Sequence, residues 1–179
     1  MLQVPKCERM ERSAATEHKL VLTEFLPYLV NRAGIKTGQS FSQDLQTFGL
    51  TLTDWRILIA LSQADNQRLL ELAEIVVTDV STLSRQVVAL ERTGHILRMR
   101  DRQDGRAVRL ALSRKARILL QKVIPIARMH ARVAVRGISA DDLATLRRCA
   151  ATIYENLETF DEERQQAENN LKDARARSR

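Results

Sequence analysis

The spacing of apolar residues predicts that most of the chain is helical. From residue 18 to about residue 48, apolar side chains recur every three or four positions, at Leu22, Phe25, Leu26, Leu29 and Val30. Gly34 and Gly38 lie inside this segment and lower its helix propensity. We therefore expect a first helix that bends or breaks near the two glycines.

Three shorter helices are predicted in the next part of the chain. Thr51 and Asp54 have the spacing of a capping box, which marks the start of the first of them. Two further helical segments, residues 70–76 and 80–92, are separated by only three residues, as in a helix-turn-helix. Gly94 is expected to end the last helix in the left-handed conformation.

After Gly94 the pattern changes from helical to alternating. Residues 95–100 and 107–112 alternate apolar and polar side chains, which predicts two short strands. The loop between them, residues 101–106, contains an Asp-Gly pair, a strong signal for a tight hairpin. Together with the preceding helices, this hairpin predicts a winged helix-turn-helix.

Two long helices are expected after the hairpin. Ser113 caps the first, which runs to about residue 135 and contains Pro125, where a helix can kink. Gly137 stops it, and Ser139 with Asp142 has the spacing to start the second. The second helix carries an apolar stripe at strict 3,4 spacing that needs a partner helix: Leu143, Leu146, Ala150, Ile153, Leu157 and Phe160.

The predicted fold class is mainly α, counted as α+β only because of the hairpin wing. We divide the chain into an N-terminal arm (residues 1–17), a dimerisation helix (18–48), a winged helix-turn-helix lobe (49–112), C-terminal dimerisation helices (113–160) and a charged tail (161–179). The tail carries five acidic and five basic residues and is expected to extend the helix or to be disordered.

Composition excludes several classes of protein. At 179 residues the chain can bury one sizeable core but is too short for a large multidomain enzyme. It has no run of 18 apolar residues and no early segment like a signal peptide, so we expect a soluble, cytoplasmic protein without a membrane partner. Cys7 and Cys149 lack CxxC spacing and form no disulfide framework, as expected in a reducing compartment.

The distribution of charge points to a polyanion. The chain has a net charge of +7, and residues 80–117 carry the whole excess. This segment has only three acidic residues, against ten basic ones: Arg85, Arg92, Arg98, Arg100, Arg102, Arg106, Arg109, Arg114, Lys115 and Arg117. A basic segment that includes the second helix of a helix-turn-helix and the following hairpin is typical of a face that binds double-stranded DNA.

The predicted helix 80–92 has two distinct faces. Leu83, Val87 and Leu90 cluster on one side and are expected to face the core. The remaining surface carries the candidate DNA contacts Ser81, Thr82, Ser84, Arg85 and Arg92, together with Val88. Small hydroxyl residues let the backbone enter a major groove, where an arginine such as Arg85 can donate two hydrogen bonds to guanine.

The hairpin tip is the second candidate contact. Arg102 and Arg106 lie on a short loop, where a guanidinium can enter the minor groove of A·T-rich DNA. Asp104 is close enough in sequence to orient one of them.

These motifs closely resemble, in order and spacing, the multiple antibiotic resistance regulator (MarR) family of winged helix-turn-helix proteins. The resemblance covers roughly residues 20–160. It is carried by Gly49-Leu-Thr-Leu-Thr-Asp-Trp-Arg-Ile-Leu58, Glu71-Leu-Ala-Glu74, Ser81-Thr-Leu-Ser-Arg85, Leu90-Glu-Arg-Thr-Gly94, Asp101-Arg-Gln-Asp-Gly-Arg106 and Leu112-Ser113. No single motif is specific, but the set is.

The resemblance implies a homodimer that presents two lobes to a pseudo-palindromic operator. It also implies a repressor that releases DNA when a small aromatic or anionic effector binds between the dimer helices and the lobes. In the family's wing, the final arginine, here Arg106, enters the minor groove, supported by the acid at Asp104. Arg102 stands where the family often has proline, and Gly105 where it often has arginine. For the effector, the candidate contacts are Tyr28, Trp55, Arg56 and Met129.

Three alternatives were weighed against a ligand-released regulator. An enzyme is disfavoured because the three histidines are scattered and the sequence has no phosphate-binding loop or nucleophile elbow, so we expect no catalytic residue, metal or cofactor. A redox-sensing regulator of the same fold would use Cys7 or Cys149, and operator release by peroxide would identify it. A protein-interaction module would show no salt-dependent DNA binding.

Overall fold

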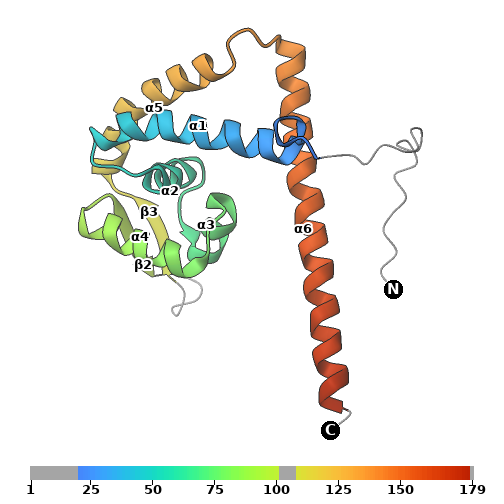
Figure 1. The fold of residues 1–179 in the computed structure, drawn as a ribbon. Coiled ribbons are helices and arrows are strands. Elements are labelled where there is room, and N and C mark those ends of the chain that lie inside the picture. Colours follow the sequence, from blue (N-terminus) through green and yellow to red (C-terminus); the bar gives the residue numbers. More distant parts are fainter. Residues whose placement is uncertain (1–19, 101–107, 178–179) are drawn as a thin grey trace. The chain divides into compact units, whose positions relative to one another are not determined.

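A computed structural model describes residues 20–100 and 108–177, with side chains described as far as residue 172. The chain divides into two compact units, the first ending at Ile118 and the second beginning at Leu119. Figure 1 shows several helices and a small sheet in the first unit, and helices without a sheet in the second.

The first unit opens with one turn of 3₁₀ helix, η1 (Leu22–Glu24), followed by α1 (Leu26–Gln46). The break that the sequence predicts near Gly34 and Gly38 is absent, because α1 continues through both glycines (Figure 1). A glycine inside a helix costs about 1 kcal/mol relative to alanine. The local cost at these two positions does not break the helix.

Packing against α2 (Leu52–Gln63) explains why α1 tolerates Gly38. Phe41 and Leu45 of α1 are buried, and a Cβ atom at Gly38 would lie only 3.1 Å from Leu52 Cδ2. Glycine at this position therefore allows the two helices to approach each other closely.

Capping and turn residues set the bounds of the next helices. The predicted capping box of α2 is confirmed: Thr51 Oγ1 accepts from the Asp54 N–H at 3.1 Å, and Asp54 Oδ2 accepts from the Thr51 N–H at 2.9 Å. Helices α3 (Leu69–Val76) and α4 (Val80–Arg92) follow, separated by three residues as predicted. Gly94 has φ +74°, which confirms the left-handed position after α4.

A three-stranded antiparallel sheet completes the first unit. The predicted hairpin strands are β2 (Ile96–Arg100) and β3 (Val108–Leu112), paired with Ile96 opposite Leu112 and Arg100 opposite Val108. The sequence analysis missed a third strand, β1 (Gln67–Arg68), which pairs with β3 and gives the order β1-β3-β2. Two residues are too few to show an alternating pattern.

The core of the first unit draws side chains from every larger element. Its largest fully buried side chains are Leu45, Ile57, Leu58, Leu61, Leu72, Leu83, Val87, Ile96 and Leu110. This core fixes α4 and the sheet relative to α2 and α3.

Helix α5 (Arg114–Ala134) begins at the end of the first unit and continues into the second. Ser113 Oγ accepts from the Ala116 N–H at 3.0 Å, which confirms the predicted cap, and the helix continues through Pro125. Gly137, with φ +86°, lies in the connection to the next helix.

Helix α6 (Ala140–Arg177) is the longest of the described elements and includes most of the predicted charged tail. Ser139 Oγ accepts from the Asp142 N–H at 3.1 Å at its start. Leu143 and Ile153 of the predicted stripe are partly exposed, whereas Leu146, Leu157 and Phe160 are each more than half exposed. Among the described residues, no helix is long and apolar enough to cross a membrane.

Candidate nucleic-acid interface

Helix α4 separates a buried face from an exposed one. Leu83, Val87 and Leu90 are buried, as the helical periodicity predicts. On the opposite side Ser81, Arg85 and Arg92 are exposed, whereas Thr82 and Ser84 on the flanks are partly buried. The core therefore fixes which side chains α4 presents to a ligand.

Asp79 caps α4 and determines the hydrogen bonding of Ser81. Asp79 Oδ1 accepts from the Thr82 N–H at 2.8 Å and from the Ser81 hydroxyl at 2.6 Å. These bonds, that from Ser81 foremost, lower the pKa of Asp79 to about 2. Because an ionised carboxylate only accepts, Ser81 has donated its one proton, and its oxygen is left as an acceptor.

Thr82 holds the side chain of Arg85. Arg85 Nη2 donates to Thr82 Oγ1 at 3.2 Å, one turn earlier on the same helix. A guanidinium has five N–H groups, so this bond leaves enough donors for a bidentate contact with a guanine. Thr82 thus orients Arg85 without consuming its capacity to bind a base.

The turn between α3 and α4 is tight and contains an unusual residue. Val77 has φ +55°, a left-handed conformation that β-branched residues rarely adopt. The Val77 N–H bonds to Glu74 O at 3.3 Å and the Thr78 N–H to Ala73 O at 3.2 Å. These bonds close the end of α3 and set the direction in which α4 begins.

Several cations of the basic segment bind groups within the first unit. Arg98 pairs with Glu91 at 2.8 Å, and Arg117 pairs with Asp65. Arg109 donates to the Asn66 carbonyl at 2.8 Å, and Lys115 to the Thr93 carbonyl at 2.7 Å. The basic segment is therefore partly structural, although Arg98, Lys115 and Arg117 remain exposed, as Arg85, Arg92 and Arg100 are.

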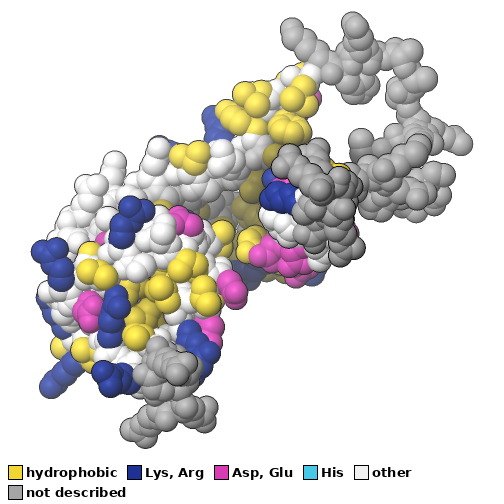
Figure 2. All heavy atoms as spheres, turned by 90° about the horizontal axis from the view of Figure 1, so that it is seen from below, with side chains coloured by type: hydrophobic (Ala, Val, Ile, Leu, Met, Phe, Trp, Pro, Cys, Tyr) yellow, Lys and Arg dark blue, Asp and Glu magenta, His cyan; other side chains and the backbone are white. Residues whose placement is uncertain are grey.

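Figure 2 shows basic side chains placed around hydrophobic ones on the face of the first unit that looks downward in Figure 1. The exposed hydrophobic residues of α4 include Val80 and Val88. The predicted wing contacts Arg102, Asp104 and Arg106 lie outside the described residues.

His95 lies where α4 passes into β2. Its Nδ1 is 2.8 Å from Thr93 Oγ1, and the Ser113 N–H donates to its carbonyl at 3.0 Å. Partial burial, and then the charge of Lys115, lowers the pKa of His95. The imidazole is therefore neutral at pH 7, and the contacts of His95 connect the end of α4 to the sheet.

Comparison with known proteins identifies this region. Residues 50–108 match the model of the MarR family. The transcriptional regulator SarZ of Staphylococcus epidermidis is 28% identical over 93 residues, which are 52% of this chain and 61% of SarZ. The chain thus spans less than two thirds of the length of the curated relatives it matches.

The same comparison extends to solved structures. A MarR-family regulator from Silicibacter pomeroyi is 27% identical with a TM-score of 0.70, over 75% of this chain and 91% of that one. This lobe is a MarR-family winged helix-turn-helix. The transcriptional repressor CouR, solved with a 23-mer DNA duplex, is 25% identical with a TM-score of 0.68, over 74% of this chain and 94% of its own.

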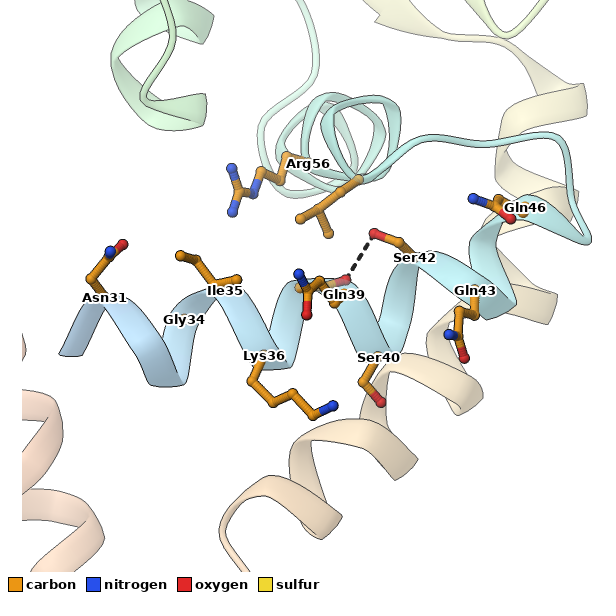
Figure 3. Close-up of a pocket in the computed structure, with 12 residues that line it drawn as sticks. Asn31, Gly34, Ile35, Lys36, Gln39, Ser40, Ser42, Gln43, Gln46 and Arg56 are labelled. Atoms are coloured by element: carbon orange, nitrogen blue, oxygen red, sulfur yellow. Dashed lines mark hydrogen bonds between the residues drawn. The ribbon is translucent and has the colours of Figure 1, made fainter. Parts of the chain in front are cut away.

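A groove lies between α1 and α2 of the first unit. It has a volume of about 800 Å³ and is lined mainly by polar residues and glycines, with Ile35 and Leu52 as its large apolar side chains. Figure 3 shows Arg56 and Asn31 on the same side of α1, whereas Lys36 points away from Arg56. The positive charge facing α1 across the groove therefore comes from Arg56.

Of the four predicted effector contacts, one lines this groove. Arg56 lines the groove, but Tyr28, Trp55 and Met129 are not among its lining residues. Trp55 instead packs edge-to-face against Phe41, with ring centroids 5.3 Å apart. The sequence analysis missed Asn31 and Gln39, polar residues of α1 for which hydrophobic periodicity gives no signal. Cys149 is exposed on α6, and Cys7 lies outside the described residues.

Proposed function

We propose that this protein is a sequence-specific DNA-binding transcriptional regulator whose α4 enters the major groove of double-stranded DNA. The observation that carries this proposal is the exposed face of α4, where Thr82 orients Arg85 on a helix held by Leu83, Val87 and Leu90. CouR, a relative with the same fold, is a repressor solved with a DNA duplex, which supports the assignment.

The first test separates base reading from general attraction to DNA. Arg85→Ala should cost about 1–3 kcal/mol of binding to an operator selected from random duplexes and relax the preference at one position in each half-site. Arg148→Ala is a matched control, because Arg148 donates to Thr145 Oγ1 at 3.0 Å on α6, also three residues earlier. Equal operator affinity of Arg85→Ala and wild type would contradict the proposal.

The wing arginines are proposed as minor-groove contacts on the basis of the sequence resemblance. Arg106→Ala should weaken binding to operator and scrambled duplex alike, and should reduce the salt slope by about one unit per half-site. Asp104→Ala should have the same effect in weaker form, since it leaves the charge of Arg106 but removes its support. Unchanged binding by Arg106→Ala at every salt concentration would exclude a wing contact.

We further propose that the protein acts as a homodimer on a pseudo-palindromic operator. Leu146, Leu157 and Phe160 of α6 are exposed in the single chain and share one face of the helix. An apolar stripe of this length favours pairing with another helix. Since two copies of one lobe match two half-sites, operator symmetry should mirror the symmetry of the dimer.

The groove between α1 and α2 is proposed as the effector site. Arg56 offers a charge for a carboxylate, and Asn31 and Gln39 add amide groups, so the polar lining favours a small anion. A ligand that binds the DNA-free conformation of the protein more tightly than the DNA-bound conformation would release the operator. The protein would then act as a ligand-controlled repressor.

A screen of small aromatic and aliphatic carboxylates against the protein–operator complex tests this site. Compounds that weaken operator binding by wild type should lose their effect on Arg56→Gln, which keeps a polar side chain without the charge. Arg32→Gln is the matched control, because it removes the charge of an exposed arginine of α1 that is not among the residues lining the groove. Effectors that act equally on Arg56→Gln would place the site elsewhere.

A further inference from the structure

Val88 is an apolar residue on the exposed, basic face of α4. Its side chain is 43% exposed, with Arg85 one turn before it and Arg92 one turn after it on the same face. Because Leu83, Val87 and Leu90 already fill the core side of the helix, Val88 lies outside the core of the first unit. A β-branched residue is also a poor choice for an exposed helix position on propensity alone.

The chemistry of the DNA surface restricts what Val88 can recognise. Its methyl groups donate and accept no hydrogen bonds, so they match neither a phosphate nor the polar edge of a base. In the major groove, the exposed apolar group is the C5-methyl of thymine. On the proposed function, in which α4 lies in the major groove, we infer that Val88 determines specificity by contacting a thymine methyl group next to the guanine read by Arg85.

The spacing along the helix fixes where that thymine lies. Arg85 and Val88 are three residues apart, which is about 4.5 Å along the helix axis. Successive bases of one DNA strand are about 3.4 Å apart. The two side chains therefore address bases within two steps of each other, and the selected operator should contain a thymine at that distance from the guanine in each half-site.

Val80 provides a matched control on the same helix. It is also a valine, is 41% exposed, and lies at the start of α4. At 100° per residue it is about 80° away from Val88 and farther still from Arg85 and Arg92, on the side toward Val87. Val80→Ala thus removes the same methyl groups at similar exposure, but away from the basic face.

The test removes single methyl groups from the DNA. The full-length protein is used to select an operator from random duplexes, and each thymine is then replaced in turn by deoxyuridine, which lacks only the C5-methyl. Replacing guanines by 7-deazaguanine locates the base that Arg85 reads. Burial of one methyl group corresponds to about a fourfold change in affinity per half-site.

For wild type and Val80→Ala, we expect one deoxyuridine position per half-site, within two steps of that guanine, to lower affinity about fourfold. Val88→Ala should bind the thymine and deoxyuridine operators equally. A thymine effect that persists in Val88→Ala, or no thymine effect in wild type, would overturn this inference while leaving DNA binding intact. If wild type selects no operator and binds no duplex, the proposed function fails and the inference with it.

Discussion

Helices α4 and α6 are both amphipathic, but they satisfy their apolar faces differently. Leu83, Val87 and Leu90 of α4 are covered by the lobe to which they belong. Leu157 and Phe160 of α6 are both 58% exposed in the single chain. In both helices the sequence pattern predicts an apolar face that must be buried. It does not predict whether the same chain or a partner buries that face. For α4 the cover is internal, and the exposed face is left for a ligand.

The largest expected effect is the loss of stability on removing a core side chain of α4. Leu83→Ala should lower the free energy of unfolding by about 2–5 kcal/mol, because Leu83 is fully buried and the cavity cannot be filled. Leu97→Ala is the control, since Leu97 is half exposed on β2. Urea unfolding at a fixed protein concentration measures both. Equal losses in the two variants would mean that α4 is not anchored through its core face.

The second largest effect is expected on dimerisation through the α6 stripe, which depends on protein concentration. Leu157→Glu places a charge in the stripe, whereas Thr159→Glu adds the same charge on the other side of the helix, about 200° away. Burying an unpaired charge is costly, so Leu157→Glu should raise the dimer dissociation constant at least tenfold and Thr159→Glu should leave it nearly unchanged. Sedimentation over a concentration series checks this. A wild type that is a folded monomer at micromolar concentration would contradict a dimer built on this stripe.

The smallest effect concerns the cap that orients α4. The pKa of Asp79 is lowered from 3.8 to about 2, first by the Ser81 hydroxyl and then by the Thr82 N–H. A lowered pKa means that the unfolded chain binds the proton first as the solution is acidified. The cap should therefore stabilise the lobe fully above pH 4, and its contribution should disappear as the pH falls from about 4 to 2. Asp79→Asn should lack this pH dependence in urea unfolding, and an unchanged profile would show that the cap is not ionised.

The local signals in the sequence were sufficient for α4. Its first residue follows the cap at Asp79, its face is set by Leu83 and Val87, and its end by Gly94, so the predicted and observed bounds agree. The first helix was predicted less well, because Gly34 and Gly38 lower helix propensity locally, yet α1 continues through both and packs against α2 at Gly38. Propensity describes a residue in isolation, and tertiary contacts override it.

The candidate sites show the same division. The exposed face of α4 could be predicted because it is the complement of the buried face, which periodicity reveals. The groove could not, because polar side chains such as Asn31 and Gln39 follow no pattern until α1 and α2 are placed together. The sequence likewise does not predict that the ring of Trp55 packs against Phe41. The ion pair of Arg98 with Glu91 likewise could not be predicted, because it forms only when the end of α4 and β2 are placed together.

Val77 has a consequence for how this lobe can change over evolutionary time. A residue with a side chain in the left-handed conformation costs about 1–2 kcal/mol, and a β-branched one belongs at the upper end. The lobe is therefore less stable than the same lobe with glycine at this turn, and most new side chains on the reading face of α4 will destabilise it further. Relief of the strain at Val77 would offset about one such change. On the proposed function, the turn, which lies outside the exposed face of α4, is thus a position from which new operator preferences become accessible without loss of the fold.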